Sequence, residues 1–335
     1  MRILAGDIGG TKTWLRIAEF STEFKTGRVL REQRYPSEDF DGLMPIIRKF
    51  MDVESENPTP NIVSACFGVA GPIAQTARGQ SVKVTNLPWE ISTQSLGTDT
   101  GIEKIKLIND FQAIGYGIEA LEEDDLAVLQ KGEAQERAPR IVIGPGTGLG
   151  VALMVWQGDH YEVISSEGGH ADFAPVDTVQ SRLLNYLTER LGHVSYERVL
   201  SGPGLVNIYE FLCAQHGGQS SVELARSLDI DDPAAAITQS ALTEGNTLAI
   251  QSVDIFISIC GAYAGNLALI ALAQGGVYIA GGIAPRLLDA FCSGSFTRSF
   301  NNKGRLSALQ ARVPVKLILN TQVGLLGAAL AASRL

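Results

Sequence analysis

Two segments of the chain share one pattern, in which a short apolar strand runs into a loop of Gly and Thr and a second apolar strand follows at once. They cover residues 2–20 and 141–156. Glycine lets a loop bring backbone N–H groups close to phosphate oxygens, because no Cβ stands in the way and a positive φ costs little. An ordinary hairpin turn is the alternative for either loop alone. The repetition, roughly one domain length apart, predicts two similar halves that face each other across a nucleotide.

The common nucleotide-binding fingerprints do not fit these loops. A dinucleotide-binding G-x-G-x-x-G opens a helix, but counted from Gly144 the sixth position is Leu149 and a β-rich run follows. A P-loop reads G-x-x-x-x-G-K-[ST], but counted from Gly6 the sixth position is Thr11, again with a strand after it. The loops therefore indicate phosphate binding of another kind.

The order of elements in the first third of the chain is typical of a ribonuclease-H-like sheet. Three strands in sequence precede helix, strand, helix, strand and helix, and the last strand, residues 104–108, delivers Asn109 and Asp110 at its carboxyl end. This order places ligands at strand ends. Asp110 could be only the N-cap of the next helix, residues 111–121. At a cleft edge its carboxylate could instead accept the proton of a substrate hydroxyl, and Asn109 has donors and an acceptor for a polyol.

A second polar cluster follows the second glycine loop, in the segment EGGHADF. Two glycines between Glu167 and His170 imply a bent backbone that lets both side chains point into one pocket. Glu167, His170 and Asp172 could also ligate a metal, although no further His or Cys lies at ligand spacing, and His170 could have a capping or core role. Hydrogen bonding to sugar hydroxyls accounts better for this mixture of groups. Glu197 stands near an apolar pair and a Gly-Pro-Gly loop, which favours a pocket role over a solvated surface charge.

Composition excludes several classes of protein. A chain of 335 residues is long for a single core and suits two domains. The formal net charge of -9 leaves no basic surface for nucleic acid. The cysteines include no C-x-x-C pair, which indicates free thiols in a reducing compartment and no zinc site. Because the N-terminus shows no signal peptide, we expect a cytoplasmic protein.

Residues 255–285 contain no Asp, Glu, Lys or Arg, and the first twenty of them could nominally span a bilayer. The neighbouring Asp254, the polar Gln274 and the lack of flanking Lys or Arg favour a buried central helix instead, so we expect no membrane segment. A short strand follows and ends in Gly281 and Gly282. An adenine or ribose could lie against the backbone of such a loop.

The chain ends in a helix rich in Ala, Leu and Gly, predicted at residues 322–333. A terminal helix of this kind commonly packs back on the first domain, which makes that domain discontinuous. We therefore expect a small α/β domain of residues 1–109 and about 320–335. Residues 110–319 would form a large α/β domain with added helices.

Six motifs together resemble those of the bacterial glucokinases outside the ROK group, which belong to the actin-like, hexokinase-type ATPase superfamily. They are GDIGGTK (6–12), IND (108–110), GPGTGLG (144–150), EGGHADF (167–173), SYERVLSGPGL (195–205) and AGGI (280–283). The resemblance implies two ribonuclease-H-like domains around a central cleft. It also implies phosphorylation of D-glucose by ATP, the first step of glycolysis, and a homodimer.

The resemblance implies a role for each matching position. Asp110 would be the general base toward the sugar 6-hydroxyl, and Asp7 would hold a hydrated Mg²⁺ ion. The implied glucose ligands are Asn109, Asp110, Glu167, His170 and Glu197, with Asn86 as a further sugar contact. The implied ATP-binding residues are Asp7, Gly9, Gly10, Thr11, Lys12, Gly146, Thr147, Gly148, Gly281 and Gly282.

One departure separates the chain from the sister group of ROK sugar kinases and repressors. These carry a cysteine-rich zinc motif after the comparable histidine, whereas here Ala171-Asp172-Phe173 follows His170 and no cysteine occurs between residues 66 and 213. We therefore expect ATP and Mg²⁺ but no structural zinc. The alternatives are a kinase for another hexose such as fructose or mannose, a polyphosphate donor, and a sugar or nucleotide sensor without catalysis.

Overall fold

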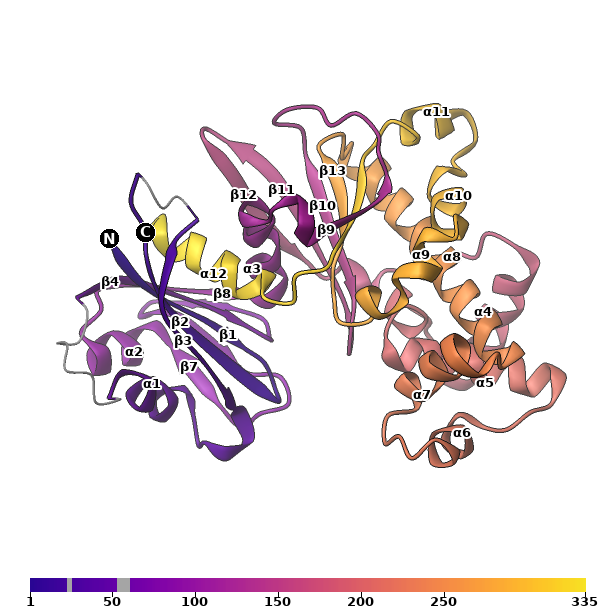
Figure 1. Cartoon of the computed structure of the whole chain (residues 1–335), viewed down its shortest axis with the longest axis horizontal. Helices are drawn as coiled ribbons and strands as arrows, with labels where there is room; N and C mark the ends of the chain where they lie inside the picture. The colour runs from indigo at the N-terminus through magenta and orange to yellow at the C-terminus, as the bar shows by residue number, and fades with distance from the viewer. Residues whose placement is uncertain (23–25, 53–60) are drawn as a thin grey trace. The chain divides into compact units, whose positions relative to one another are not determined.

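The computed structural model describes residues 1–22, 26–52 and 61–335. The chain divides into two compact units (Figure 1). Unit 1 consists of Met1–Glu123, Tyr161–Ser165 and Asn320–Leu335, and unit 2 consists of Asp124–His160 and Ser166–Leu319. The C-terminal segment thus belongs with the N-terminal unit, and the first boundary falls after Glu123, whereas the sequence led us to expect it after residue 109.

Unit 1 is built on a five-stranded sheet with the order β3-β2-β1-β4-β8. Its strands are β1 (Arg2–Ile8), β2 (Lys12–Glu19), β3 (Arg28–Pro36), β4 (Ile62–Val69) and β8 (Lys104–Asn109). β1 pairs antiparallel with β2 and parallel with β4, and β4 pairs parallel with β8. This is the predicted ribonuclease-H-like order. The carboxyl ends of β1, β4 and β8 therefore meet at one edge of the sheet.

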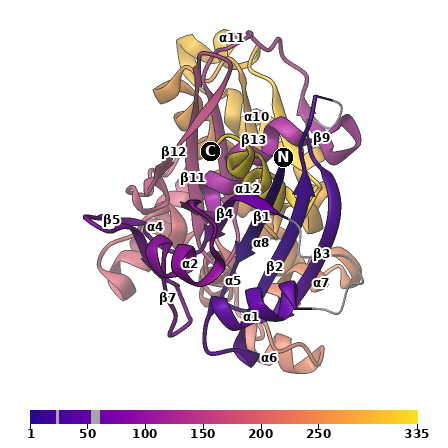
Figure 2. The same ribbon diagram turned by 90° about the vertical axis from the view of Figure 1, so that its left-hand side faces the viewer.

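The remaining elements of unit 1 are a small three-stranded sheet and the helices that cover the large one. They are η1 (Ser37–Asp39), α1 (Leu43–Met51), β5 (Ala74–Thr76), β6 (Gly79–Lys83), β7 (Glu90–Ser92), α2 (Thr93–Thr100), α3 (Asp110–Gly117), η2 (Ile118–Ala120) and α12 (Val323–Ser333). α12 packs on α3 and on β1, so the two ends of the chain lie in one unit (Figures 1 and 2).

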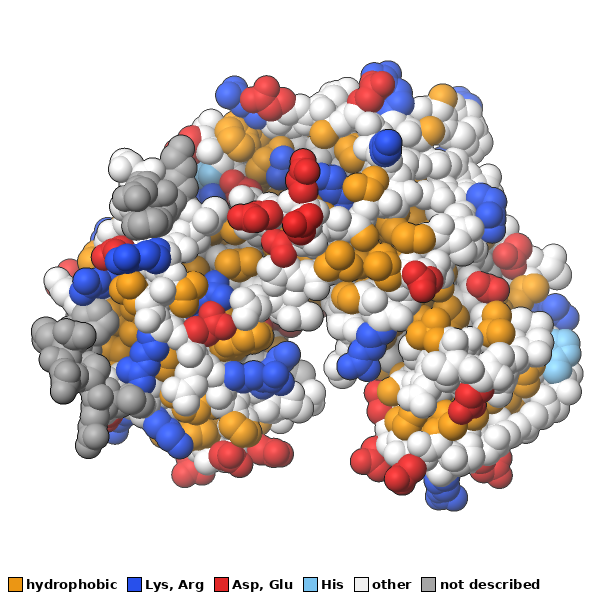
Figure 3. Space-filling model, viewed as in Figure 1, with side chains coloured by type: hydrophobic (Ala, Val, Ile, Leu, Met, Phe, Trp, Pro, Cys, Tyr) orange, Lys and Arg blue, Asp and Glu red, His pale blue; other side chains and the backbone are white. Residues whose placement is uncertain are grey.

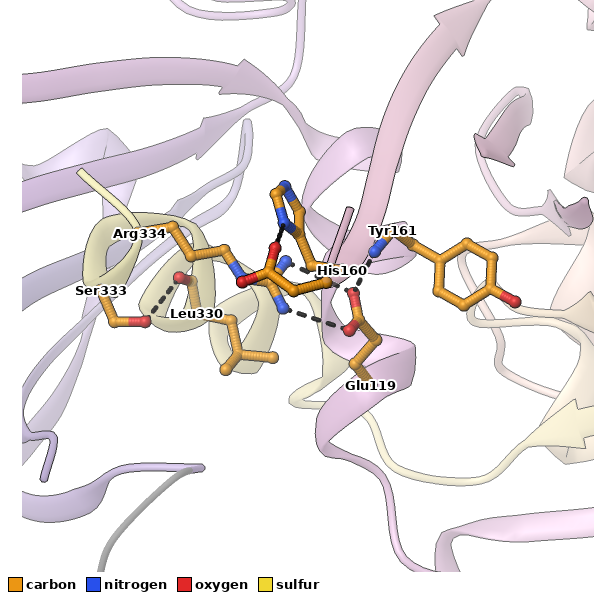
Figure 4. Close-up of polar contacts among 7 residues, drawn as sticks. Glu119, His160, Tyr161, Leu330, Ser333 and Arg334 are labelled. Carbon is orange, nitrogen blue, oxygen red and sulfur yellow. Dashed lines mark hydrogen bonds and ion pairs between the residues drawn. The ribbon is translucent and has the colours of Figure 1, made fainter. Parts of the chain in front are cut away.

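The end of the chain is held by an ion pair within unit 1. The guanidinium of Arg334 donates hydrogen bonds of 3.3 and 3.1 Å to the two carboxylate oxygens of Glu119 (Figure 4). Glu119 also accepts a longer bond of 3.4 Å from the backbone N–H of Tyr161. A partly buried, two-point pair of this kind fixes orientation as well as contact.

A second sheet, of six strands, repeats the same order; five of its strands lie in unit 2, whereas residues Tyr161–Ser165 of its edge strand β12 are grouped with unit 1. The order is β12-β11-β10-β13-β14-β9. The strands are β9 (Leu126–Gln130), β10 (Arg140–Pro145), β11 (Leu149–Gln157), β12 (His160–Ser166), β13 (Gly276–Ile279) and β14 (Val315–Ile318). β10 pairs antiparallel with β11 and parallel with β13, and β13 pairs parallel with β14. The added edge strand β9, antiparallel to β14, was not predicted.

Helices make up most of the rest of unit 2. They are α4 (Thr178–Leu191), α5 (Gly202–His216), α6 (Ser221–Ser227), α7 (Pro233–Gln239), α8 (Thr247–Ala271), α9 (Leu288–Cys292), α10 (Ser295–Asn301) and α11 (Ser307–Gln310). Shorter turns of helix are η3 (Glu123–Asp125), η4 (Gly168–His170), η5 (Tyr196–Arg198), η6 (Ser240–Glu244), η7 (Ala284–Leu287) and η8 (Gly304–Leu306). η3 spans the boundary between the units.

Among the described residues, α8 is the one helix long and apolar enough to cross a membrane by length and composition. In the most apolar 18-residue stretch of α8, 61% of the residues are buried inside the protein. Phe256, Cys260 and Ala264 on this helix belong to the core of unit 2. Packing in that core therefore accounts for the apolar run, in agreement with the buried helix that the sequence predicted.

Charges of both signs are interspersed on the protein surface. On the face drawn in Figure 3, Lys and Arg side chains lie scattered among Asp and Glu and do not gather in one field. Together with the net charge of -9, this face offers no continuous basic surface of the kind that binds nucleic acid.

Candidate active site

Unit 1 carries two carboxylates at one edge of its sheet. Asp7 is the last but one residue of β1, Asp110 follows directly after β8, and β4 lies between these two strands. Burial, and then the negative charge of Asp110, raise the pKa of Asp7 from 3.8 to about 6, while Lys12 acts in the opposite direction. The parallel strands thus bring two carboxyl groups into electrostatic contact where a ligand of this fold binds.

Asn109 has a structural role at the start of α3. Its Oδ1 accepts a hydrogen bond of 2.9 Å from the backbone N–H of Phe111, and its own N–H donates to Gln112 Oε1 at 3.1 Å. These two bonds form a capping box. The N-cap is thus Asn109, while Asp110, for which we had considered that role, is the first residue of the helix. The side-chain amide nitrogen of Asn109 donates a long hydrogen bond of 3.4 Å to Gly71 O. Both ends of the Asn109 side chain therefore contact backbone groups of unit 1.

The first glycine loop is a tight turn in unit 1. The N–H of Gly9 donates to the carbonyl of Lys12 at 2.9 Å, and Ser37 Oγ donates to the carbonyl of Gly9 at 3.0 Å. Asn86 has a positive φ of 64° and lies beside this loop, because a Cβ on Gly10 would be 3.4 Å from the Cβ of Asn86. The loop, Asn86 and the two carboxylates all belong to unit 1.

Unit 2 contains a cavity of about 640 Å³ next to the second glycine loop. Gly146 and Thr147 of that loop line it together with Gly282, so two motifs far apart in the sequence meet at one cavity. Its other walls come from the start of α5, from α7 and from η7. A volume of this size lies within the range of small-molecule and cofactor sites.

The third glycine motif touches the second one directly. Gly281 has a φ of 88°, and a Cβ at this position would lie 2.3 Å from the carbonyl oxygen of Pro145 at the end of β10. Only glycine permits both the left-handed backbone and this close approach. The end of β13 therefore packs directly against the end of β10, and Gly282, the next residue, lines the cavity.

Glu167, His170 and Glu197 form a polar cluster in unit 2. His170 Nε2 lies 3.9 Å from Glu167 Oε2, and His170 Nδ1 lies 4.0 Å from Glu197 Oε1. The side chains of Glu167 and His170 are largely exposed, whereas that of Glu197 is 30% exposed. Polar and accessible groups of this kind can hydrogen-bond to the hydroxyls of a sugar.

Backbone pairing holds the two segments of this cluster together. The N–H of Phe173 donates to Val194 O at 3.0 Å, and the N–H of Tyr196 donates to Ala171 O at 2.9 Å. The hydroxyl of Tyr263 on α8 donates to the carbonyl of Gly168 at 2.6 Å. The turn that carries His170 is thus fixed both to the segment of Glu197 and to the core.

The comparison with known proteins decides the family. Residues 4–335 match the family model described as Glucokinase. The chain belongs to the glucokinase family. A protein named Glucokinase from Nostoc sp. is 44% identical over 346 residues, which cover 99% of each chain.

Solved structures of glucokinases share the fold. The crystal structure of a glucokinase from an Antarctic psychrotroph has a TM-score of 0.85 at 32% identity and covers 100% of this chain and 99% of that one. A ROK family glucokinase from Streptomyces griseus, crystallised in complex with glucose and AMPPNP, has a TM-score of 0.63 at 19% identity and covers 100% of both chains. The fold is that of the actin-like ATPases, as the sequence predicted.

The metal alternative for this glucokinase-family chain finds no support in the polar cluster. Asp172 Oδ1 pairs with His193 Nε2 at 2.7 Å. Within residues 1–22, 26–52 and 61–335, no three His, Cys, Asp or Glu side chains are grouped so as to hold a metal ion.

Sequence reasoning missed several residues that line the cavity beside the second glycine loop of this family member. They are Asn207, Asp232, Ala235, Thr238, Ile283 and Arg286. The pair Asp232-Pro233 is readable as a helix start, because an Asp N-cap and a Pro at the first helical position are preferred there. That signal locates α7 but not the cavity that α7 lines.

Proposed function

We propose that this enzyme of the glucokinase family transfers the γ-phosphoryl group of ATP to the 6-hydroxyl of D-glucose. The products are glucose 6-phosphate and ADP, and the reaction is the entry step of glycolysis. The observation that carries the proposal is the cavity of about 640 Å³ at which the second glycine loop and Gly282 meet. The family match over residues 4–335 supports glucose as the acceptor.

ATP is assigned to unit 2 by this proposal. Thr147 and Gly148 would hold phosphates through backbone N–H groups, and Gly146, whose N–H donates to Gly148 O at 2.8 Å, would shape the turn beside them. Gly281 and Gly282 would lie against the adenosine. The first residues of α5 also line the cavity. The N-terminus of a 15-residue helix attracts anions, because the helix dipole is positive there. The walls therefore suit a nucleoside phosphate.

Asp7 is the proposed holder of a hydrated Mg²⁺ ion, with Gly9 to Lys12 as the loop next to the phosphates. Burial raises the pKa of Asp7 to about 6, and a nearby cation would restore the charged carboxylate. When bound, Mg²⁺ neutralises the phosphate oxygens and orients them for in-line transfer. Lys12 adds a positive charge on the same loop.

We assign glucose to Asn109 and Asp110 in unit 1 and to Glu167, His170 and Glu197 in unit 2. Asn86, beside the first loop, is a further proposed contact. Phosphoryl transfer leaves little covalent chemistry for the protein, so positioning of the hydroxyl contributes most. Asp110 orients the 6-hydroxyl and takes its proton as the new P–O bond forms.

The proposal also covers the cellular location and the oligomeric state of the protein. The family resemblance supports a cytoplasmic homodimer that needs no zinc. Size-exclusion chromatography with light scattering tests the dimer, and a molar mass near that of one 35.8 kDa chain would contradict it.

A hexose panel tests the activity. The purified chain is supplied with ATP or polyphosphate and with glucose, fructose or mannose, and ADP or sugar phosphate is measured. We expect turnover with glucose and ATP, and its loss in Asp110→Ala. Turnover with another hexose or with polyphosphate alone would change the substrate. Glucose binding without turnover in the wild type would make the protein a sensor.

A further inference from the structure

Glu197 is tied to the end of the second phosphate loop. Its Oε2 accepts a hydrogen bond of 3.0 Å from the backbone N–H of Leu149, the first residue of β11. Its Oε1 lies on the side of His170, 4.0 Å from Nδ1. One carboxylate oxygen is therefore fixed by the loop, and the other belongs to the polar cluster.

The segment that carries Glu197 is joined to the loop a second time. The N–H of Gly202 donates to the carbonyl of Gly146 at 2.8 Å. Between these points, Ser201 Oγ donates to the carbonyl of Glu197 at 2.7 Å and accepts from the N–H of Gly204 as the N-cap of α5. Since α5 lines the nucleotide cavity at its start, this short segment connects the polar cluster with that cavity inside unit 2.

Gly148 lies next to the carboxylate of Glu197. A Cβ at this position would lie 2.6 Å from Oε2 of Glu197, which no real contact tolerates without movement. Gly148 is not among the glycines with positive φ, so alanine suits its backbone. A Cβ at Gly146, two residues earlier, meets nothing within 4 Å. An alanine at 148 would therefore press on Glu197, whereas one at 146 would not.

We propose that Gly148 is a positioning residue for glucose that acts through Glu197. The missing side chain lets Oε2 reach the N–H of Leu149, and that bond holds Oε1 in place for a sugar hydroxyl. The inference rests on the proposed function, in which Glu197 is a glucose ligand. A residue of the ATP loop thereby sets the affinity for glucose before any nucleotide binds.

The same bond couples the two ligands. A phosphate that reorders the loop at Leu149 also moves the carboxylate of Glu197. Binding linkage is reciprocal, so glucose must change the affinity for nucleotide by the factor by which nucleotide changes the affinity for glucose. Loss of the bond in Gly148→Ala should bring that factor close to one.

Calorimetric titration of the full chain with glucose, in the absence of nucleotide, tests the proposal. We expect Gly148→Ala to raise the dissociation constant about ten-fold or more, the size of one lost hydrogen bond to a charged group. The control variant Gly42→Ala, at a glycine outside both proposed ligand sites where a Cβ meets nothing within 4 Å, should stay within about two-fold of the wild type. Because the side chain of Asp is one methylene too short to reach Leu149, Glu197→Asp should bind weakly, and adding Gly148→Ala to it should change little further.

Three results overturn the inference. The first is a Gly148→Ala dissociation constant within two-fold of the wild type; if Glu197→Asp still weakens binding, the proposed function stands. The second is unchanged binding in Glu197→Asp. The third is a wild type that binds no glucose, which removes the proposed function too. If Gly148→Ala does not fold, Glu197→Gln provides the test, because the amide oxygen of Gln can still accept the hydrogen bond from the backbone N–H of Leu149. It should bind glucose more tightly than Glu197→Asp, and the reverse order would refute the idea.

Discussion

The carboxylate of Asp7 lies within reach of the negative charge of Asp110, across the strand that separates β1 from β8. Like charges at one strand edge destabilise the folded state unless a cation is present. Burial adds to the effect, and both raise the pKa of Asp7 to about 6. At neutral pH these two carboxylates therefore lower the stability of the folded protein, and the proposed Mg²⁺ ion would offset that loss.

Asp7→Asn should stabilise the protein at neutral pH. The pKa of Asp7 is about 6 in the folded state and 3.8 ordinarily, so the folded state binds this proton more tightly. The protonated carboxyl of Asp7 therefore stabilises the folded state below pH 3.8, and this stabilisation is lost as the pH rises through 6. After allowance for partial exposure, the gain at about pH 7.5 is roughly 1 to 2 kcal/mol and shrinks toward about pH 4. Thermal melts across pH measure it, with the exposed Asp99→Asn as control. A gain in stability that is the same at about pH 7.5 as at about pH 4 would contradict the prediction.

Asp110→Asn should separate binding from chemistry. The amide keeps the size and a hydrogen-bonding oxygen but cannot take the proton of the hydroxyl. We expect kcat to fall by about 10² to 10⁴, with the KM for glucose within about ten-fold of the wild type. Steady-state kinetics with ADP detection measures both constants, and Asp99→Asn is again the control. A kcat within ten-fold of the wild type would remove Asp110 from the role of base.

Gly281→Ala should destabilise unit 2 far more than Gly282→Ala. At Gly281 the φ is 88° and the new Cβ meets the carbonyl of Pro145 at 2.3 Å, whereas at Gly282 it meets nothing within 4 Å. We expect a loss of about 2 to 4 kcal/mol for the first change and below about 1 kcal/mol for the second. The urea concentrations at the unfolding midpoints of the two variants and the wild type measure both losses. Similar midpoints would mean that the exit of β13 does not press on β10.

The features that sequence predicted well are those fixed by local chemistry. Both glycine loops lie between paired strands, because a tight strand connection and its glycines are read from neighbouring residues. The strand at residues 104–108 is found as Lys104–Asn109, and the helix at 322–333 as Val323–Ser333. Apolar periodicity set these bounds without help from distant parts of the chain.

What sequence did not predict depends on distant contacts. β9 is a short edge strand whose partner β14 lies far along the chain. The apolar run placed the start of the central helix at residue 255, but α8 begins at Thr247, where the side chain of Asn246 caps two more amphipathic turns. The cavity lining of α7 and the bond from Glu197 to Leu149 exist only after folding.

Arg334→Ala should destabilise unit 1 without affecting sugar binding. Arg334 binds Glu119 through two hydrogen bonds, and the pair is only 27% and 19% exposed (Figure 4). Its guanidinium also lies 5.8 Å from the ring centre of Tyr116. We expect a loss of about 1 to 3 kcal/mol, with Arg334→Lys in between, because lysine cannot form the two-point pair. Thermal melts measure the loss and the exposed Arg305→Ala is the control. A melting temperature equal to that of the control would show that the pair is not stabilising.

Ala235→Trp should block ATP and spare glucose. Ala235 lines the cavity from α7, and an indole there occupies space that the nucleotide needs, whereas Glu167, His170 and Glu197 are not among the lining residues. We expect the KM for ATP to rise at least about ten-fold while the glucose dissociation constant without nucleotide stays within about two-fold. Ala214→Trp makes the same change at an exposed position of α5 outside the cavity and should leave both constants unchanged. If Ala235→Trp weakened glucose binding and left the KM for ATP unchanged, the cavity would belong to the sugar and the nucleotide would have to bind elsewhere.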